Sequence, residues 1–159
     1  MSTLIVYSSK YGCTKNCTDL LQKRLKDKVD IVNLKTSKDL TISQYDKVII
    51  GGSIYIGKIQ KEVREFCSSN IEKLKEKQIG LFICGMQEGE MLSNEFDQNF
   101  PKELLNAAIA KECFGGEFNF SKMNFLEKFI VKKISKVSSN KSNILTENIN
   151  KFAQAMNSI

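Results

Sequence analysis

The sequence predicts an α/β protein: a doubly wound, five-stranded parallel sheet in the order 2-1-3-4-5, with helices on both faces. The first observation is that short apolar runs alternate with amphipathic stretches along the chain. This alternation is typical of parallel strands joined by right-handed helical crossovers. The second observation is the length, because 159 residues suit one domain with a single substantial core. We therefore predict one domain over residues 1–159.

The five strands are predicted from apolar runs of four to six residues. The run Leu4 to Val6 has no polar break, as expected for a strand that is buried on both faces. Val48 to Ile50 and Leu81 to Ile83 are similar runs. The predicted strands cover residues 3–8, 30–34, 47–51, 78–84 and 112–118.

The helices are predicted from apolar residues that recur at helical spacing on one face. Pro101 fits the first turn of the third helix, and Asn143 or a neighbour is the expected N-cap of the last one. Residues 85–101 form a looser region after the fourth strand. The predicted helices cover residues 14–28, 59–75, 101–110, 123–137 and 143–157.

The five cysteines are odd in number and irregularly spaced, and the chain has no histidine. This composition argues against a zinc site, so we expect no metal and predict reduced thiols in a cytoplasmic protein. Cys13 and Cys17 lie four residues apart near a predicted helix start. A thiol pKa can be lowered there, so a redox role for this pair stays open as the alternative.

The formal net charge is +6, and its one local concentration lies in the helix predicted over residues 123–137. Six lysines lie between residues 122 and 141, against Glu127 alone. A basic amphipathic helix can lie on an anionic membrane surface or dock a partner. The alternative is that its apolar half packs on the domain while its lysines face water. The other lysines are spread over helix faces, and we expect no nucleic-acid partner.

The predicted strand order has its switch point between the first and third strands, where ligands of such sheets bind. The loop after the first strand carries Ser9, Gly12 and Thr14 directly before a helix. Free loop amides and the helix dipole make an anion site there. Ser9 and Thr14 would donate hydroxyls, and Gly12 would allow close backbone approach. The alternative is that Ser9 and Thr14 are only turn and capping residues.

The sequence of this first loop excludes other known classes of phosphate-binding loop. The Walker A pattern G-x-x-x-x-G-K-[ST] and the dinucleotide pattern G-x-G-x-x-G are both absent. The first and third strands do not end in the acidic residues of a receiver domain, and no arginine follows Cys13 at phosphatase spacing. The remaining interpretation is a phosphate cradle of hydroxyls and backbone amides that does not hydrolyse its ligand.

The loop after the third strand places Tyr55 between glycines, which suggests a flat ligand lying on its ring. The alternative is that Tyr55 packs on the following helix as an ordinary surface aromatic. The loop after the fourth strand, residues 85–89, could close the other side of that ligand, with Met86 supplying polarizable apolar contact.

Over essentially its whole length the chain resembles the flavodoxin family, whose members bind flavin mononucleotide (FMN). The resemblance lies in the run from Leu4 to Thr14, which is similar to the family's phosphate loop S/T-x-x-G-x-T, and in the run Ser53 to Gly57. The resemblance implies that the first loop wraps the FMN phosphate and that the other two line the ring. The implied FMN-binding residues are Ser9, Lys10, Tyr11, Gly12, Cys13 and Thr14; Ser53, Ile54, Tyr55, Ile56 and Gly57; and Gly85, Met86, Gln87 and Glu88.

Within this family the chain looks closer to the branch that contains bacterial menaquinone-dependent protoporphyrinogen IX dehydrogenase. The similarity lies in residues 50–58 and in residues 114–118 with the basic stretch that follows. The resemblance implies a redox protein that transfers electrons through FMN to or from a partner protein. The alternative is an enzyme that passes electrons from the porphyrinogen through FMN to a quinone. Peripheral contact with the inner face of the membrane, through the helix at 123–137, would fit either role. The sequence indicates no catalytic residue.

Overall fold

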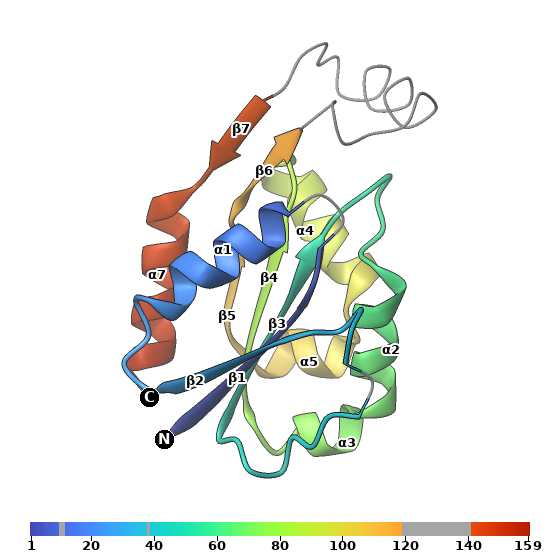
Figure 1. Ribbon diagram of the computed structural model, residues 1–159. Helices are drawn as coiled ribbons and strands as arrows, with labels where there is room; N and C mark the ends of the chain where they lie inside the picture. Colours follow the sequence, from blue (N-terminus) through green and yellow to red (C-terminus); the bar gives the residue numbers. More distant parts are fainter. Residues whose placement is uncertain (10–11, 38, 119–140) are drawn as a thin grey trace.

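A computed structural model describes residues 1–9, 12–37, 39–118 and 141–159 (Figure 1). Among these residues the main sheet has five parallel strands in the order β2-β1-β3-β4-β5, which confirms the predicted fold class. A second, antiparallel sheet pairs β6 with β7. In the described ranges no helix is long and apolar enough to cross a membrane.

Strands and helices alternate up to β5 except that β3 follows β2 directly, and two helices lie between β3 and β4 and between β4 and β5. The strands are β1 (Ser2–Ser8), β2 (Lys28–Asn33), β3 (Lys47–Ser53), β4 (Gln78–Cys84), β5 (Ala108–Cys113), β6 (Gly115–Phe118) and β7 (Lys141–Ile144). The helices are α1 (Cys13–Gln22), α2 (Lys61–Ser69), α3 (Ile71–Leu74), α4 (Gly89–Asn99), α5 (Lys102–Ala107) and α7 (Thr146–Asn157).

The sheet separates two apolar cores. Because side chains alternate along a strand, Leu4 and Val6 of β1 face one core while Ile5 faces the other. Helices α2 to α5 cover the first face, and α1 and α7 cover the second (Figure 1). The strands β1, β3 and β4 are buried along almost their whole length, which explains why their sequences read as unbroken apolar runs.

The second core depends on a close approach between two neighbouring strands. Gly51 of β3 pairs with Phe82 of β4, and a side chain at Gly51 would begin 2.1 Å from the Phe82 ring. Phe82 stacks on Phe114 with ring centroids 4.6 Å apart and meets Phe152 of α7 edge to face. The glycine therefore makes room for the aromatic cluster that holds α7 on the sheet.

Lys47 is buried at the start of β3, with 2% of its surface exposed. Its ammonium donates to the Met156 carbonyl at 2.7 Å and pairs with the Asp27 carboxylate at 2.8 Å. Lys47 holds the pKa of Asp27 below its ordinary range, by hydrogen bonding and by charge. The hydrogen bond to Met156 ties α7 to the end of the sheet opposite the carboxyl ends of β1 and β3.

The first two predicted helices differ in extent from the prediction. The helix expected at 14–28 ends at Gln22, because the chain must be extended by Lys28, where β2 begins to pair with β1. The helix expected at 59–75 divides into α2 and α3 at Asn70. The Asn70 side-chain amide donates to the Phe66 carbonyl at 2.9 Å and so competes with the helical pattern.

The region after β4 differs more from the prediction. Residues 85–101, predicted to be loose, contain the helix α4. The strand predicted at 112–118 is two strands, because Gly115 adopts a φ of 86° and turns the chain out of the main sheet. The helix predicted at 101–110 ends at Ala107. Asn143 is not an N-cap but lies in β7, and α7 begins at Thr146. The basic helix predicted at 123–137 lies outside the described residues.

Candidate functional site

The first loop connects β1 to the N-terminus of α1 at the carboxyl end of the sheet. Gly12 precedes the helix with φ of 94°, in the left-handed region that favours glycine. Its amide donates to the Ser9 hydroxyl at 3.0 Å, so Ser9 shapes the turn. The first helical hydrogen bond runs from Asn16 to the Gly12 carbonyl. Helix geometry leaves the amides before Asn16 without intrahelical acceptors, and the helix dipole adds positive potential there.

Thr14 is fully buried in the first turn of α1. Its hydroxyl oxygen has no hydrogen-bond partner in the part of the chain that the structure describes. An unsatisfied buried hydroxyl costs about 1–3 kcal/mol. The N-cap position belongs to Gly12, so Thr14 is not the capping residue that the alternative interpretation required. The Thr14 hydroxyl is therefore suited to donate a hydrogen bond to an anion that the first loop would hold.

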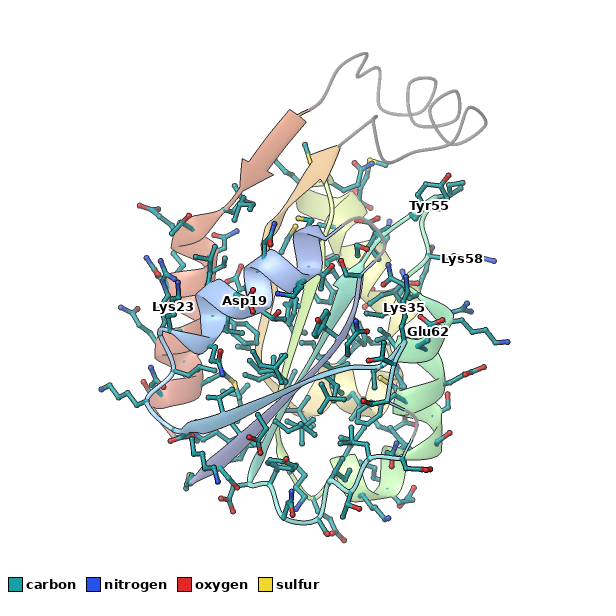
Figure 2. The ribbon with its side chains drawn as sticks, in the orientation of Figure 1. Asp19, Lys23, Lys35, Tyr55, Lys58 and Glu62 are labelled. Carbon is teal, nitrogen blue, oxygen red and sulfur yellow. The ribbon has the colours of Figure 1, made fainter. Side chains whose placement is uncertain are left out.

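A lysine that the sequence analysis did not single out lies beside the first loop. Lys35, in the turn after β2, donates through its ammonium to the Ser9 carbonyl at 2.7 Å. On the neighbouring strand end, the Ser8 hydroxyl donates to the Glu62 carboxylate at 2.9 Å. These two contacts place Lys35 and Glu62, both labelled in Figure 2, at successive residues of the chain where β1 ends. No motif marks Lys35; only the pairing of β2 with β1 brings it to the site.

The second loop forms a tight turn beyond β3. Tyr55 and Lys58 exchange two backbone hydrogen bonds, of 2.9 and 3.1 Å. The turn residues Ile56 and Gly57 both have positive φ, of 51° and 76°. Tyr55 is half-buried, and its side chain projects outward from the loop (Figure 2). Ile56 is 54% exposed at the tip. The turn thus presents an aromatic ring and an aliphatic side chain at the edge of the site.

Two amide side chains hold this second loop in place. Gln60 accepts a hydrogen bond from the Ser53 amide at 3.0 Å and also donates to the Ser53 hydroxyl. Asn99 of α4 is buried; it accepts from the Ile59 amide at 3.0 Å and donates to the Gly57 carbonyl at 3.1 Å. Sequence reasoning missed Asn99 because α4 was not predicted.

The third loop follows β4 and lies beside β6. The Gly85 amide donates to the Gly115 carbonyl at 2.8 Å. The Met86 sulfur packs against Gly116, where a side chain would begin only 2.5 Å from it. Met86 and Gln87 are half-buried, and Glu88 is exposed. The strand pair β6–β7 therefore forms one wall next to this loop (Figure 1).

A carboxyl group from α4 also lies near the third loop. One oxygen of Glu95 is buried and lacks a hydrogen-bond partner within the described ranges. It is 3.8 Å from the point where a side chain would begin at Gly85. Burial raises the pKa of Glu95. Like Asn99, it belongs to the helix that the sequence pattern did not reveal.

Directly beneath the first loop, three buried thiols meet: Cys13 and Cys17 of α1 and Cys84 at the end of β4. Hydrogen bonds from the Cys17 and Cys84 thiols lower the pKa of Cys13 to about 4. The pKa of Cys17 is raised, chiefly by its hydrogen bond to Cys13, and the pKa of Cys84 is raised by its bonds to both partners. Of the three thiols, only Cys13 has its pKa lowered, because it accepts hydrogen bonds from the other two.

The structure brings together three loops at the carboxyl ends of β1, β3 and β4 (Figure 1). The predicted site residues lie in these loops, in the first turn of α1 and at the end of β3, except for Lys10 and Tyr11, which lie outside the described residues. Their arrangement defines a doubly wound α/β protein with its candidate site at the switch point of the sheet.

The chain belongs to the flavodoxin domain family, which it matches over residues 4–144. It is 22% identical to a protoporphyrinogen IX dehydrogenase [quinone] of Escherichia coli K12, over 92% of this chain and 86% of that protein. A homologue of the same name from Leishmania major is also 22% identical, over 91% of this chain and 66% of that protein.

Solved flavodoxins share the fold. A flavodoxin from Streptococcus pneumoniae TIGR4 superposes with a TM-score of 0.61 and 18% identity, covering 99% of each chain. A Fusobacterium nucleatum flavodoxin, solved bound to flavin mononucleotide, superposes with a TM-score of 0.55 and 15% identity, covering 99% of this chain and 97% of that one. These structural similarities establish the flavodoxin fold of this chain.

Proposed function

We propose that this protein is an FMN-binding, flavodoxin-like redox protein that transfers electrons. The observation that carries the proposal is the buried Thr14 hydroxyl in the first turn of α1, which has no hydrogen-bond partner among the described residues. Membership of the flavodoxin family supports it. So does the fold shared with a Fusobacterium nucleatum flavodoxin that was solved with flavin mononucleotide bound.

In this proposal the first loop holds the FMN phosphate. The Thr14 hydroxyl and the amides at the start of α1 donate hydrogen bonds to it, and the helix dipole favours its negative charge. Lys35 adds a positive charge at the rim of the loop. Ser9 fixes the turn through the Gly12 amide, and Cys13 contributes its backbone as the first residue of the helix. Lys10 and Tyr11 would complete the loop.

The second and third loops would orient the flavin ring. When bound, FMN supplies a ring system that accepts and donates electrons. Tyr55 and Ile56 would cover one side of this ring, and Asn99 and Gln60 keep their loop rigid. Gly85, Met86 and Gln87, with the exposed Glu88 at the rim, would line the other side. The chain thus provides position and electrostatics, and the cofactor provides the redox chemistry.

A second candidate function is favoured by the curated relatives. The E. coli and L. major homologues are named protoporphyrinogen IX dehydrogenase [quinone] and match more than nine tenths of this chain. The protein would then be an enzyme that oxidises a porphyrinogen through FMN and reduces a quinone. The strand pair β6–β7 beside the third loop would form part of the substrate's surroundings.

The proposed partners follow from these two functions. A carrier needs a partner redox protein, whereas the enzyme needs a quinone and a porphyrin substrate. For either we propose a cytoplasmic protein whose basic segment 123–137 contacts the inner face of the membrane. A variant with glutamate at Lys128, Lys132 and Lys133 tests this contact. Anionic liposomes should bind it more weakly than the parent; equal binding would contradict the membrane contact.

The experiment that tests the proposed function is an absorbance spectrum of the purified protein, followed by identification of any released flavin. Protein that is colourless, and that fails to bind added FMN at micromolar concentration, would refute both functions. Turnover of protoporphyrinogen IX with a menaquinone analogue then separates them. Turnover supports the enzyme, and FMN binding without turnover supports the electron carrier.

A further inference from the structure

Three of the five thiols in this protein gather in one buried cluster under the first loop. Cys13 and Cys17 lie four residues apart, which places both side chains on the same face of α1. That face packs against the sheet, where Cys84 ends β4. The three sulfur atoms lie within 4.8 Å of one another, and all three residues are buried.

These distances match the ligand set of a metal ion. Metal–thiolate bonds of about 2.3 Å place three trigonal sulfurs about 4 Å apart, so the cluster needs only small side-chain adjustments. Among the described residues no further Cys, Asp or Glu joins the group, and the sequence contains no histidine. The described part of the chain therefore offers a group of three thiol ligands and no fourth member.

We propose that Cys13, Cys17 and Cys84 form a three-thiolate site for a soft metal ion, with Cu⁺ as the best match. Thiolate sulfur selects soft ions, and a set of three sulfurs suits the low coordination number of Cu⁺. Zn²⁺ is less well served, since its structural sites are almost always four-coordinate. On binding, three Cu–S bonds form, each thiol that is still protonated releases its proton to solvent, and no electron is transferred.

The surroundings of the cluster favour this site. Cys13 is the first residue of α1, where the positive end of the helix dipole favours a thiolate ligand over a thiol. Ile5, Leu21 and Phe82 belong to the same apolar cluster and keep the sulfurs away from bulk water. Cys13 retains 7% exposure and directly follows the first loop, which is the side from which an ion would enter.

The remaining two cysteines provide the contrast. Cys67 and Cys113 belong to the core on the other face of the sheet. Burial raises the pKa of the Cys67 thiol to about 12, as expected for a cysteine that serves only as a small apolar residue. Cys67→Ala is therefore a matched control for Cys17→Ala, because both changes remove one buried thiol from a helix that packs on the sheet.

The test is a competition titration. The full chain, reduced, stripped of metal and kept free of oxygen, is titrated with Cu⁺ against the chelator bicinchoninate, both with and without FMN. We expect one equivalent of Cu⁺ in the parent protein and in Cys67→Ala. Outer-shell changes typically lower metal affinity about 10–100-fold, and removing a ligand should lower it more. Cys17→Ala and Cys84→Ala should therefore bind Cu⁺ at least ~100-fold more weakly than the parent protein. Circular dichroism confirms that each variant is folded.

X-ray absorption of the Cu⁺-loaded parent protein gives an independent reading that needs no variant, and should show three sulfur neighbours. The proposal is overturned if the parent does not compete with the chelator, if all variants bind equally, or if fewer than three sulfurs surround the ion. A disulfide within the cluster in place of metal binding would also overturn it. The site does not rest on the proposed function, since Cu⁺ binding is measured separately from FMN binding.

Discussion

Replacing Thr14 by valine should stabilise the FMN-free protein and weaken FMN binding at the same time. Valine keeps the branched shape of threonine but replaces the buried hydroxyl, which has no partner in the described ranges, by a methyl group. Removing that unsatisfied group should raise the free energy of unfolding by about 1 kcal/mol, within the 1–3 kcal/mol cost of such groups. A hydrogen bond to a charged phosphate contributes about 1.5–3 kcal/mol, so FMN should bind about 10–150-fold more weakly.

Thr18→Val is the matched control for this experiment. Thr18 is also buried in α1, one turn further along, but its hydroxyl donates to the Lys15 carbonyl at 2.7 Å. The same substitution there should lower the free energy of unfolding by about 1 kcal/mol and leave FMN affinity unchanged. Urea denaturation of the FMN-free proteins and fluorescence titration with FMN measure the two quantities. Equal FMN affinity in Thr14→Val and the parent would refute the assignment of Thr14 to the phosphate.

Three further predictions concern the surroundings of the site and the fold. Lys35→Ala should weaken FMN binding about 2–5-fold at low salt, as expected for the loss of a surface charge, and added salt should reduce this difference in affinity from the parent. A loss of affinity that does not depend on salt in a fluorescence titration would contradict this. Asn99→Ala leaves the Ile59 amide and the Gly57 carbonyl without their partner and should lower the free energy of unfolding by about 2–3 kcal/mol in urea denaturation; a change below ~0.5 kcal/mol would show that the second loop is held by other contacts. Because Lys47 lowers the pKa of Asp27 in the folded protein, this ion pair stabilises the fold above the unfolded carboxyl pKa of about 4, and the stabilisation is lost as the pH falls through the folded pKa. The free energy of unfolding of Asp27→Asn should therefore fall less between about pH 5 and pH 2 than that of the parent protein. Parallel pH profiles would argue against the pair.

The sheet was predictable because its signal is local and strong. Strands such as β1 and β3 are buried on both faces, so their apolar runs have almost no polar interruption. Their order follows from the alternation of strands and helices, and the order alone brings the first and second loops together. Most of the candidate site was therefore accessible from the sequence.

The parts that the sequence did not reveal depend on contacts between distant residues. Helix α4 has only two buried residues, Phe96 and Asn99, so its apolar periodicity is weak. Asn99 and Glu95 were missed with it. The division between β5 and β6 rests on the backbone of a single glycine, Gly115, and on pairing with β7. The meeting of Cys84 with the α1 thiols needs the register of the whole sheet.

The central claim, that the first loop holds the phosphate of a flavin, is tested most directly by comparing FMN with riboflavin. The two ligands share the ring and differ by the phosphate group, so their affinity ratio measures what the loop contributes. With Thr14, the amides of α1 and Lys35 all engaged, FMN should bind at least ~100-fold more tightly than riboflavin, equivalent to about 2.7 kcal/mol. Equal affinity for the two, or no binding of either, would contradict the account.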